Sequence, residues 1–174
     1  MYHMIAHQPV GYNFHEDHCR IRELEHGRVL SHPLVNHYYA TAFVYDDAVW
    51  VFATDYEDSD KRSQCHKISM TRSTDLKSWT APQTILSMDA GESVFNNSVV
   101  RAGNQFVLLY ESNDRKYVPF TFKFAVSDDL VHWRKLPDAI YGAEKYVGGP
   151  TLCYFAPYYY CLLYTSPSPR DRSL

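Results

Sequence analysis

Residues 73–79 read STDLKSW, and residues 127–133 repeat the pattern as SDDLVHW. The tryptophans that close the two copies, Trp79 and Trp133, lie 54 residues apart, so the chain contains an internal repeat. In each copy an Asp side chain is placed to accept hydrogen bonds from turn N–H groups, as in Asx turns. The Trp then opens a strand, and we expect its ring to wedge between neighbouring repeats. The motif indicates an architecture and not a chemistry.

A hairpin with the same plan precedes each copy of the motif. Apolar runs flank Asp46-Asp47 in the first repeat and Gly103-Asn104 in the second, and such residues favour tight hairpin turns. A third alternating run then leads into each motif. The predicted strands are residues 41–45, 49–54 and 67–72 in the first repeat, and 97–101, 106–111 and 120–126 in the second.

These runs, with the strand after each Trp, form a four-stranded antiparallel unit of roughly 50 residues, which is typical of a propeller blade. A third copy starts at residues 149–155, turns near Ala156-Pro157 and resumes at residues 158–160. We therefore expect an all-β propeller that follows a lead-in segment. The expected boundaries are 1–33 for the lead-in and about 34–90, 91–146 and 147–160 for the blades.

Composition supports a folded β domain and excludes several classes of partner. The 174 residues are 45% hydrophobic and 16% aromatic, which argues against disorder and favours strands. The net charge of −3 gives no basic footprint for nucleic acid. No apolar run approaches the length of a membrane span, and the N-terminus shows no signal peptide pattern. We expect neither a nucleic-acid partner nor a membrane partner.

The sequence predicts no metal and no cofactor. The four cysteines have no C-x-x-C spacing, and we expect Cys19, Cys65 and Cys153 to be small buried apolar side chains. His15 and His18 have a spacing that suits metal ligation on a helix, but their segment lacks a helical apolar period.

The character of the chain changes at its C-terminal end. Residues 161–171 read CLLYTSPSPRD, which resembles a translated transposon-end adapter from DNA sequencing libraries. The alternative is a natural Ser/Pro linker after a strand. We expect residues 161–174 to be non-native and to lie outside the fold, and the protein behind this sequence to be longer.

Read with residues 149–152 (GPTL) and 158–160 (YYY), the repeated turn resembles the five-bladed propellers of glycoside hydrolase families 43 and 32. The resemblance covers residues 34–160. It implies an incomplete five-bladed β-propeller, with two blades and the start of a third. It also implies a carbohydrate substrate, an oligosaccharide or glycoside, held in a funnel at one end of the propeller axis.

The sequence departs from these families at two of their acidic positions. An Asp in an Arg-Asp-Pro segment usually opens one inner strand, and the equivalent segment here is residues 95–98 (FNNS). A Glu in a Glu-Gly-Pro segment usually opens the next, and that position is Gly148. Because glycoside hydrolysis needs two carboxyl groups, the usual site is absent.

Two other carboxyl groups are predicted to be catalytic. In an antiparallel hairpin the second strand ends beside the start of the first, which places Asp55 and Glu111 at the funnel. Glu111 ends an apolar run, so desolvation is expected to raise its pKa, as a general acid requires. The alternative for Glu111 is a structural ion pair with Arg115 or Arg101. The alternative for Asp55 is a solvated acidic loop.

The same geometry places several polar and aromatic side chains at the funnel. The asparagines there can bind sugar hydroxyls or instead cap the strand start, and the histidine can be a satisfied polar side chain. The predicted substrate-binding residues are Asn96, Asn97, His37, Tyr56, Asp114 and Arg115.

Three functions are compatible with these observations. The first is a glycoside hydrolase-like enzyme whose acids come from unusual positions. The second is a non-catalytic carbohydrate-binding propeller, which Gly148 and the two asparagines favour. The third is a protein-interaction propeller of the WD40 kind, but the chain lacks the Gly-His and Trp-Asp dipeptides at the repeat period.

Overall fold

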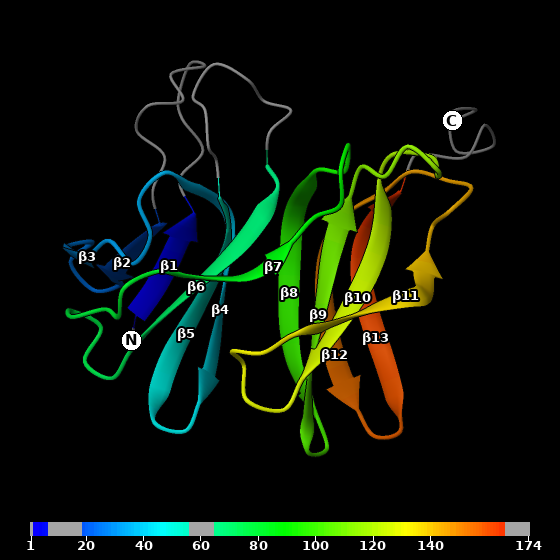
Figure 1. The fold of residues 1–174 in the computed structure, drawn as a ribbon. Helices are drawn as coiled ribbons and strands as arrows, with labels where there is room; N and C mark the ends of the chain where they lie inside the picture. Colours follow the sequence, from blue (N-terminus) through cyan, green and yellow to red (C-terminus); the bar gives the residue numbers. More distant parts are fainter. Residues whose placement is uncertain (1, 7–18, 56–64, 166–174) are drawn as a thin grey trace, which may run out of the picture.

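The computed structural model describes residues 2–6, 19–55 and 65–165, and within them the secondary structure consists of strands without helices. Figure 1 shows the strands gathered into separate sheets that stand side by side. In this part of the chain there is accordingly no helix long and apolar enough to cross a membrane.

Two four-stranded antiparallel sheets form the centre of the molecule, and both run in sequence order. The first sheet contains β4 (His37–Tyr45), β5 (Ala48–Asp55), β6 (Lys67–Ser73) and β7 (Gln83–Ser87). The second sheet contains β8 (Val94–Ala102), β9 (Gln105–Ser112), β10 (Thr121–Ser127) and β11 (Arg134–Tyr141). The predicted repeat and its strands are confirmed, and the two sheets are consistent with propeller blades.

A smaller sheet lies at each side of this pair. The third sheet is the hairpin of β12 (Val147–Phe155) and β13 (Tyr158–Thr165). Strand β13 continues five residues past the expected boundary at 160, because Cys161 and Leu163 pack against the second sheet. Residues 161–165 of the tail are therefore part of a strand, and residues 166–174 lie outside the described residues.

The lead-in segment contains strands that the sequence did not reveal. β1 (Tyr2–Ala6), β2 (Cys19–Glu23) and β3 (Val29–Ser31) form an antiparallel sheet beside the first sheet. In β2, Cys19 and Ile21 alternate with more exposed residues, which is the pattern of a strand with one buried face.

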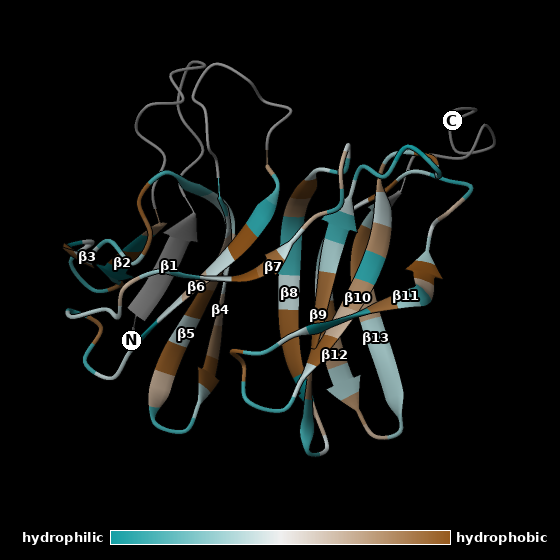
Figure 2. Cartoon of the chain, viewed as in Figure 1, coloured by the Kyte–Doolittle hydropathy of each residue, from teal (hydrophilic) through white to brown (hydrophobic). Residues whose placement is uncertain are grey.

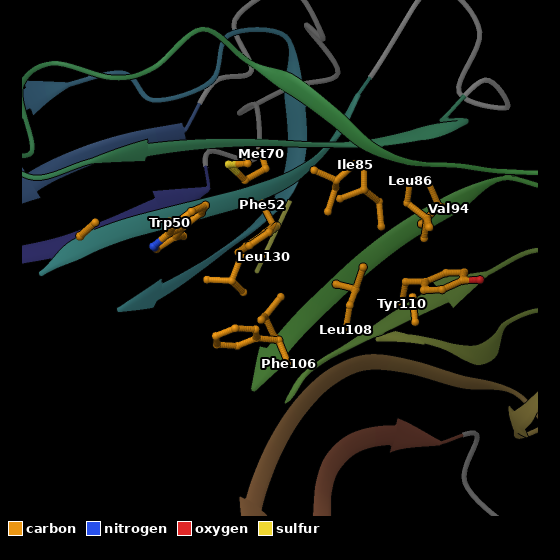
Figure 3. Packing of buried hydrophobic residues seen from close by; sticks show 14 residues of the cluster. Trp50, Phe52, Met70, Ile85, Leu86, Val94, Phe106, Leu108, Tyr110 and Leu130 are labelled. Atoms are coloured by element: carbon orange, nitrogen blue, oxygen red, sulfur yellow. The ribbon is translucent and has the colours of Figure 1, made fainter. Parts of the chain in front are cut away.

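The central strands of the two large sheets are buried on both faces. On β9, Phe106, Leu108 and Tyr110 belong to the cluster between the first and second sheets, whereas Val107 and Leu109 belong to the cluster shared with the third sheet. Figure 3 shows the first of these clusters, and Figure 2 shows the apolar positions along the strands. Because alternate side chains point to opposite faces, one continuous apolar run serves two interfaces.

The hairpin turns follow from their residues. Asp46 and Asp47 both have a φ of +52°, and Gly103 has a φ of +64°. A two-residue turn with positive φ matches the right-handed twist of the flanking strands, and Asp and Gly tolerate that conformation well.

The repeated motif forms the predicted Asx turn in both copies. Asp129 Oδ1 accepts hydrogen bonds from the N–H groups of Val131 (2.9 Å) and His132 (2.7 Å), and Asp75 makes the equivalent pair. The hydrogen bonds from the His132 side chain and from the turn N–H groups hold the pKa of Asp129 well below its usual range. Leu130 accommodates the turn by adopting a φ of +66°.

The tryptophans of the motif occupy the interfaces between sheets, as predicted. The Trp133 ring meets Phe52 of the first sheet edge to face, with 6.1 Å between ring centroids. Trp79 packs against the cluster that includes Cys19 and Leu34, and its indole N–H donates to Ser31 Oγ at 2.9 Å. Each ring therefore joins its own sheet to the preceding one.

Replacing Asp129 by Ala removes the acceptor of two turn N–H groups, and we expect the free energy of unfolding to fall by about 1 kcal/mol. Asp129→Asn keeps a carbonyl oxygen and should lose less. Because the folded-state pKa of Asp129 is depressed, its stabilisation is present above the ordinary Asp pKa and is lost as the pH falls through the folded-state value. Urea unfolding at neutral and acid pH checks both expectations.

The exposed face of β13 predicts self-association. Tyr160, Leu162 and Tyr164 are 54%, 74% and 75% exposed and alternate with inward-facing residues, so they form one apolar face on an edge strand. We expect the purified chain to form oligomers in size-exclusion chromatography with light scattering. Replacing these three residues by Ser should shift it toward monomer, whereas Val44→Ser, at an exposed residue of β4, should not. A monodisperse wild-type monomer contradicts this expectation.

Candidate functional site

The inner strands β4, β8 and β12 all begin at one end of the sheets, the upper end in Figure 1, and β5 and β9 end there. Hydrogen bonds between sheets gather at this end. Thr54 Oγ1 donates to the Phe95 carbonyl at 2.7 Å, and Asn97 Nδ2 donates to the Tyr39 carbonyl at 2.9 Å. Further along, the Leu152 N–H donates to Ser98 Oγ at 3.0 Å. The strand starts are thus held in fixed relative positions.

Glu111, at the end of β9, is the central carboxyl group of this region. The residue is 4% exposed, and its Oε2 accepts hydrogen bonds from Asn96 Nδ2 (3.0 Å) and from the Gly149 N–H (2.9 Å). Burial raises the pKa of Glu111, and the hydrogen bonds from Gly149 and Asn96 only partly oppose this. Its partners are therefore Asn96 and Gly149, and not Arg115 or Arg101, which were expected in the ion-pair alternative.

Gly148 lies directly beside this carboxyl group. A Cβ atom on Gly148 would be 3.6 Å from Glu111 Oε2 and only 2.9 Å from the Tyr146 hydroxyl. The Glu111 carboxyl and the Tyr146 hydroxyl thus border the space that a side chain at 148 would enter. Tyr146 itself was not among the predicted site residues.

The two predicted asparagines have different surroundings. Asn96 is half-buried and binds Glu111, whereas Asn97 is buried and its amide nitrogen donates to Tyr39 on the neighbouring sheet. Asn97 therefore joins two sheets, and Asn96 is the one that lies with the carboxyl group.

Asp55 and His37 form a second cluster, on the first sheet. They are cross-strand partners, and His37 Nε2 lies 4.0 Å from Asp55 Oδ1. His37 Nδ1 is 2.7 Å from the Val35 carbonyl oxygen, so that nitrogen carries the proton when the ring is neutral. Asp55 and Glu111 thus belong to separate clusters. Tyr56 lies outside the described residues.

An ionic network that is buried at Glu92 and half-buried at Lys123 and Asp114 fixes the loop that follows β9. Lys123 Nζ lies 2.7 Å from Glu92 Oε1 and 2.8 Å from Asp114 Oδ2, and Ser112 Oγ donates to Glu92 Oε1 at 2.6 Å. Burial alone would raise the pKa of Asp114, but the hydrogen bonds from Lys123 and from the Lys116 N–H give a net lowering. Asp114 is therefore a structural partner of Lys123.

The structure also places Arg115 and the cysteines. Arg115 is exposed on the same loop, and Cys19 and Cys65 are buried free thiols, as expected, while Cys153 is half-buried. Within the described ranges, no group of three or more His, Cys, Asp or Glu residues is placed to hold a metal ion.

The comparisons with known proteins agree with this architecture. No protein-family model and no curated protein sequence matches the chain. A solved family 43 β-xylosidase/α-arabinofuranosidase from a compost microbial metagenome, bound to xylotriose, superposes with a TM-score of 0.60 at 17% identity. The match covers 74% of this chain and 43% of that one.

Two fungal enzymes give similar values. An α-L-arabinanase from Penicillium chrysogenum, bound to arabinobiose, superposes with a TM-score of 0.59 at 11% identity. The match covers 80% of this chain and 46% of the arabinanase chain. An exo-β-1,3-galactanase from Phanerochaete chrysosporium, bound to β-1,3-galactotriose, superposes with a TM-score of 0.62 at 14% identity. The match covers 82% of this chain and 34% of the galactanase chain. The chain spans less than half of the length of each of these three structures.

Stacked antiparallel sheets joined through their inner strands are consistent with the blades of a β-propeller. The structural matches make this more specific, since the chain has the fold of the propellers of glycoside hydrolase family 43.

The ionic network gives a stability prediction. Lys123→Met leaves the Glu92 carboxyl group buried without its cation, and we expect a loss of about 3 kcal/mol in the free energy of unfolding. The double variant Lys123→Met with Glu92→Gln should recover part of the loss, because the uncompensated charge is gone. Lys135→Met, which removes an exposed pair with Asp89, should cost less than about 1 kcal/mol. Equal losses in both single variants, measured by urea unfolding, would contradict the prediction.

Proposed function

We propose that this chain is part of a five-bladed, glycoside hydrolase-like propeller that binds an oligosaccharide or glycoside where its inner strands begin, with Glu111 as the acid. One observation carries the proposal. The Glu111 carboxyl group lies beside Gly148, with its Oε2 3.6 Å from where a side chain at 148 would begin. It thus supplies a carboxyl group next to the position at which the family pattern expects its acid.

The surroundings of Glu111 suit proton donation. Its raised pKa favours the neutral acid at higher pH than for an exposed Glu. Because Oε2 accepts two N–H hydrogen bonds, Oε1 is the oxygen that carries the proton of the neutral form. In the proposed step that proton moves to the glycosidic oxygen as the bond from this oxygen to the sugar carbon breaks. The Glu111 carboxylate remains.

Asp55 is the proposed second carboxyl group. Asp55 lies on the neighbouring sheet and is about a quarter exposed. His37 lies beside it, where a protonated imidazole ring would stabilise the negative charge of the Asp55 carboxylate. As a base, Asp55 takes a proton from the water that attacks the sugar carbon. Asn96 orients Glu111 and offers its amide to sugar hydroxyls, and exposed Arg115 is proposed as a further contact.

A non-catalytic carbohydrate-binding propeller is the second candidate. It is supported by Gly148 and Asn96, which replace the family's acids by groups that cannot transfer a proton at neutral pH. In that case the chain binds sugar without cleaving it, and Glu111 serves as a hydrogen-bond acceptor only.

Glu111→Gln separates the two candidates. Gln keeps an oxygen for the Asn96 and Gly149 hydrogen bonds, so the variant should fold like the wild type. It cannot donate a carboxylic proton, and we expect the hydrolysis rate of aryl glycosides with unactivated leaving groups to fall about 100- to 10,000-fold. The measurement is kcat on aryl xylosides, arabinosides and galactosides, obtained from the rate at which the hydrolysis product is released.

The matched control is Glu144→Gln, at an exposed glutamate in the loop between β11 and β12, which should leave hydrolysis unchanged. Wild-type hydrolysis that persists in Glu111→Gln excludes Glu111 as the acid. Sugar binding by the wild type without hydrolysis supports the non-catalytic candidate.

A further inference from the structure

The third sheet, which stands beside the second sheet in Figure 1, has one covered face and one open face. Leu152, Cys161 and Leu163 lie on the covered face and pack into the cluster shared with the second sheet. Since side chains alternate along a strand, the pairing of β12 with β13 gathers the remaining side chains on the opposite face. We call this open side the outer face, and it carries Cys153, Phe155, Tyr158, Tyr160, Leu162 and Tyr164.

The outer face is strongly apolar and exposed. Its four aromatic side chains and its leucine are more than half exposed, from 54% at Tyr160 to 75% at Tyr164. Elsewhere in the described ranges, exposed large apolar side chains are spread over several elements, as Val29 on β3 and Val44 on β4 are. A contiguous exposed patch of this kind marks a site of interaction with another surface.

The chemistry of the outer face selects its partner. Residues 147–165 contain no charged side chain. A strongly acidic or basic partner would therefore find no complementary charge there, and a membrane surface would find no Lys or Arg. A two-fold axis, in contrast, sets a face against itself, and an uncharged face meets its own copy without like-charge repulsion.

From these observations we propose that the outer face binds the outer face of a second copy of this chain, in a dimer with two-fold symmetry. The contact packs one sheet on another, as the first and second sheets already pack within the chain. Because the described residues form no other exposed apolar sheet face of comparable extent, the same surface serves in both copies and the assembly closes at two. This inference goes beyond the proposed function, since the interface contains neither Glu111 nor Asp55.

The size of the outer face sets the strength of the dimer. A fully buried aromatic side chain covers roughly 150–250 Å², so the exposed parts of these side chains offer on the order of 500 Å² per copy. A standard stable interface buries about 800 Å² per partner. We therefore expect a reversible dimer with a dissociation constant in the micromolar range.

Sedimentation velocity on the full chain, over a range of concentrations that spans the micromolar, tests the proposal. We expect one monomer–dimer equilibrium. Leu162→Asp and Leu162→Lys should each weaken it about tenfold or more, because each variant sets like charges into the same desolvated interface. An equimolar mixture of the two variants should regain dimers, because opposite charges then share the interface.

Two further variants separate the outer face from other surfaces. Val44→Asp introduces the same charge on β4, at a residue that is 74% exposed like Leu162, and should dimerise like the wild type. Phe155→Asp lies on β12, away from the free edge of β13, and should weaken the dimer as Leu162→Asp does. Circular dichroism confirms that each variant is folded.

Several outcomes overturn the proposal. These are a wild-type monomer at every concentration, assemblies larger than a dimer, and a dimer that persists in Leu162→Asp. A dimer that is lost in Leu162→Asp but persists in Phe155→Asp indicates pairing through the edge of β13 and also overturns it. A monomer that dimerises only after removal of residues 166–174 assigns the outer face to that segment instead. None of these outcomes bears on the proposed function, which is tested by hydrolysis.

Discussion

The structure depends on central strands that are buried on both faces. In β9 the side chains at even positions, from Phe106 to Tyr110, fill the interface with the first sheet, and Val107 and Leu109 fill the interface with the third. Since a strand alternates its side chains strictly, the direction of every residue in β9 is fixed by this packing. Glu111 is the next odd position after Leu109, so it must face the third sheet, where it meets Gly149.

The first sheet shows the same rule with a different side chain. Relative to the hairpin turn, Thr54 of β5 occupies the position that Glu111 occupies in β9, and its hydroxyl binds the Phe95 carbonyl of the following sheet. A neutral hydroxyl is thus sufficient to join two sheets at this position. A carboxyl group there carries an additional desolvation cost, visible in the raised pKa of Glu111. The bridging role alone therefore does not account for a glutamate at this position.

Sequence reasoning recovered the features that depend on neighbouring residues. The hairpins around Asp46-Asp47 and Gly103-Asn104, the Asx turns and the burial of Glu111 all follow from local patterns. Contacts between distant loops do not follow from local patterns, because nothing in such a pattern pairs Lys123 with Glu92 or aligns Phe120 with Tyr146. The strands of the lead-in were missed for the same reason, since a short strand is recognisable only beside its partners.

Gly148 and Gly149 are closely surrounded by other side chains. A side chain there would crowd the Tyr146 hydroxyl, and one at Gly149, where φ is +60°, would collide with the Tyr164 ring at 2.7 Å. The two glycines therefore let the start of β12 pass close to both tyrosines while the Gly149 N–H reaches Glu111. Placing a carboxyl group at 148 would require Tyr146 to move and would set a second acid beside a carboxyl group that is already desolvated. Glycine at 148, the inward Tyr146 hydroxyl and a buried Glu111 consequently form one mutually dependent arrangement, on which the proposed role of Glu111 relies.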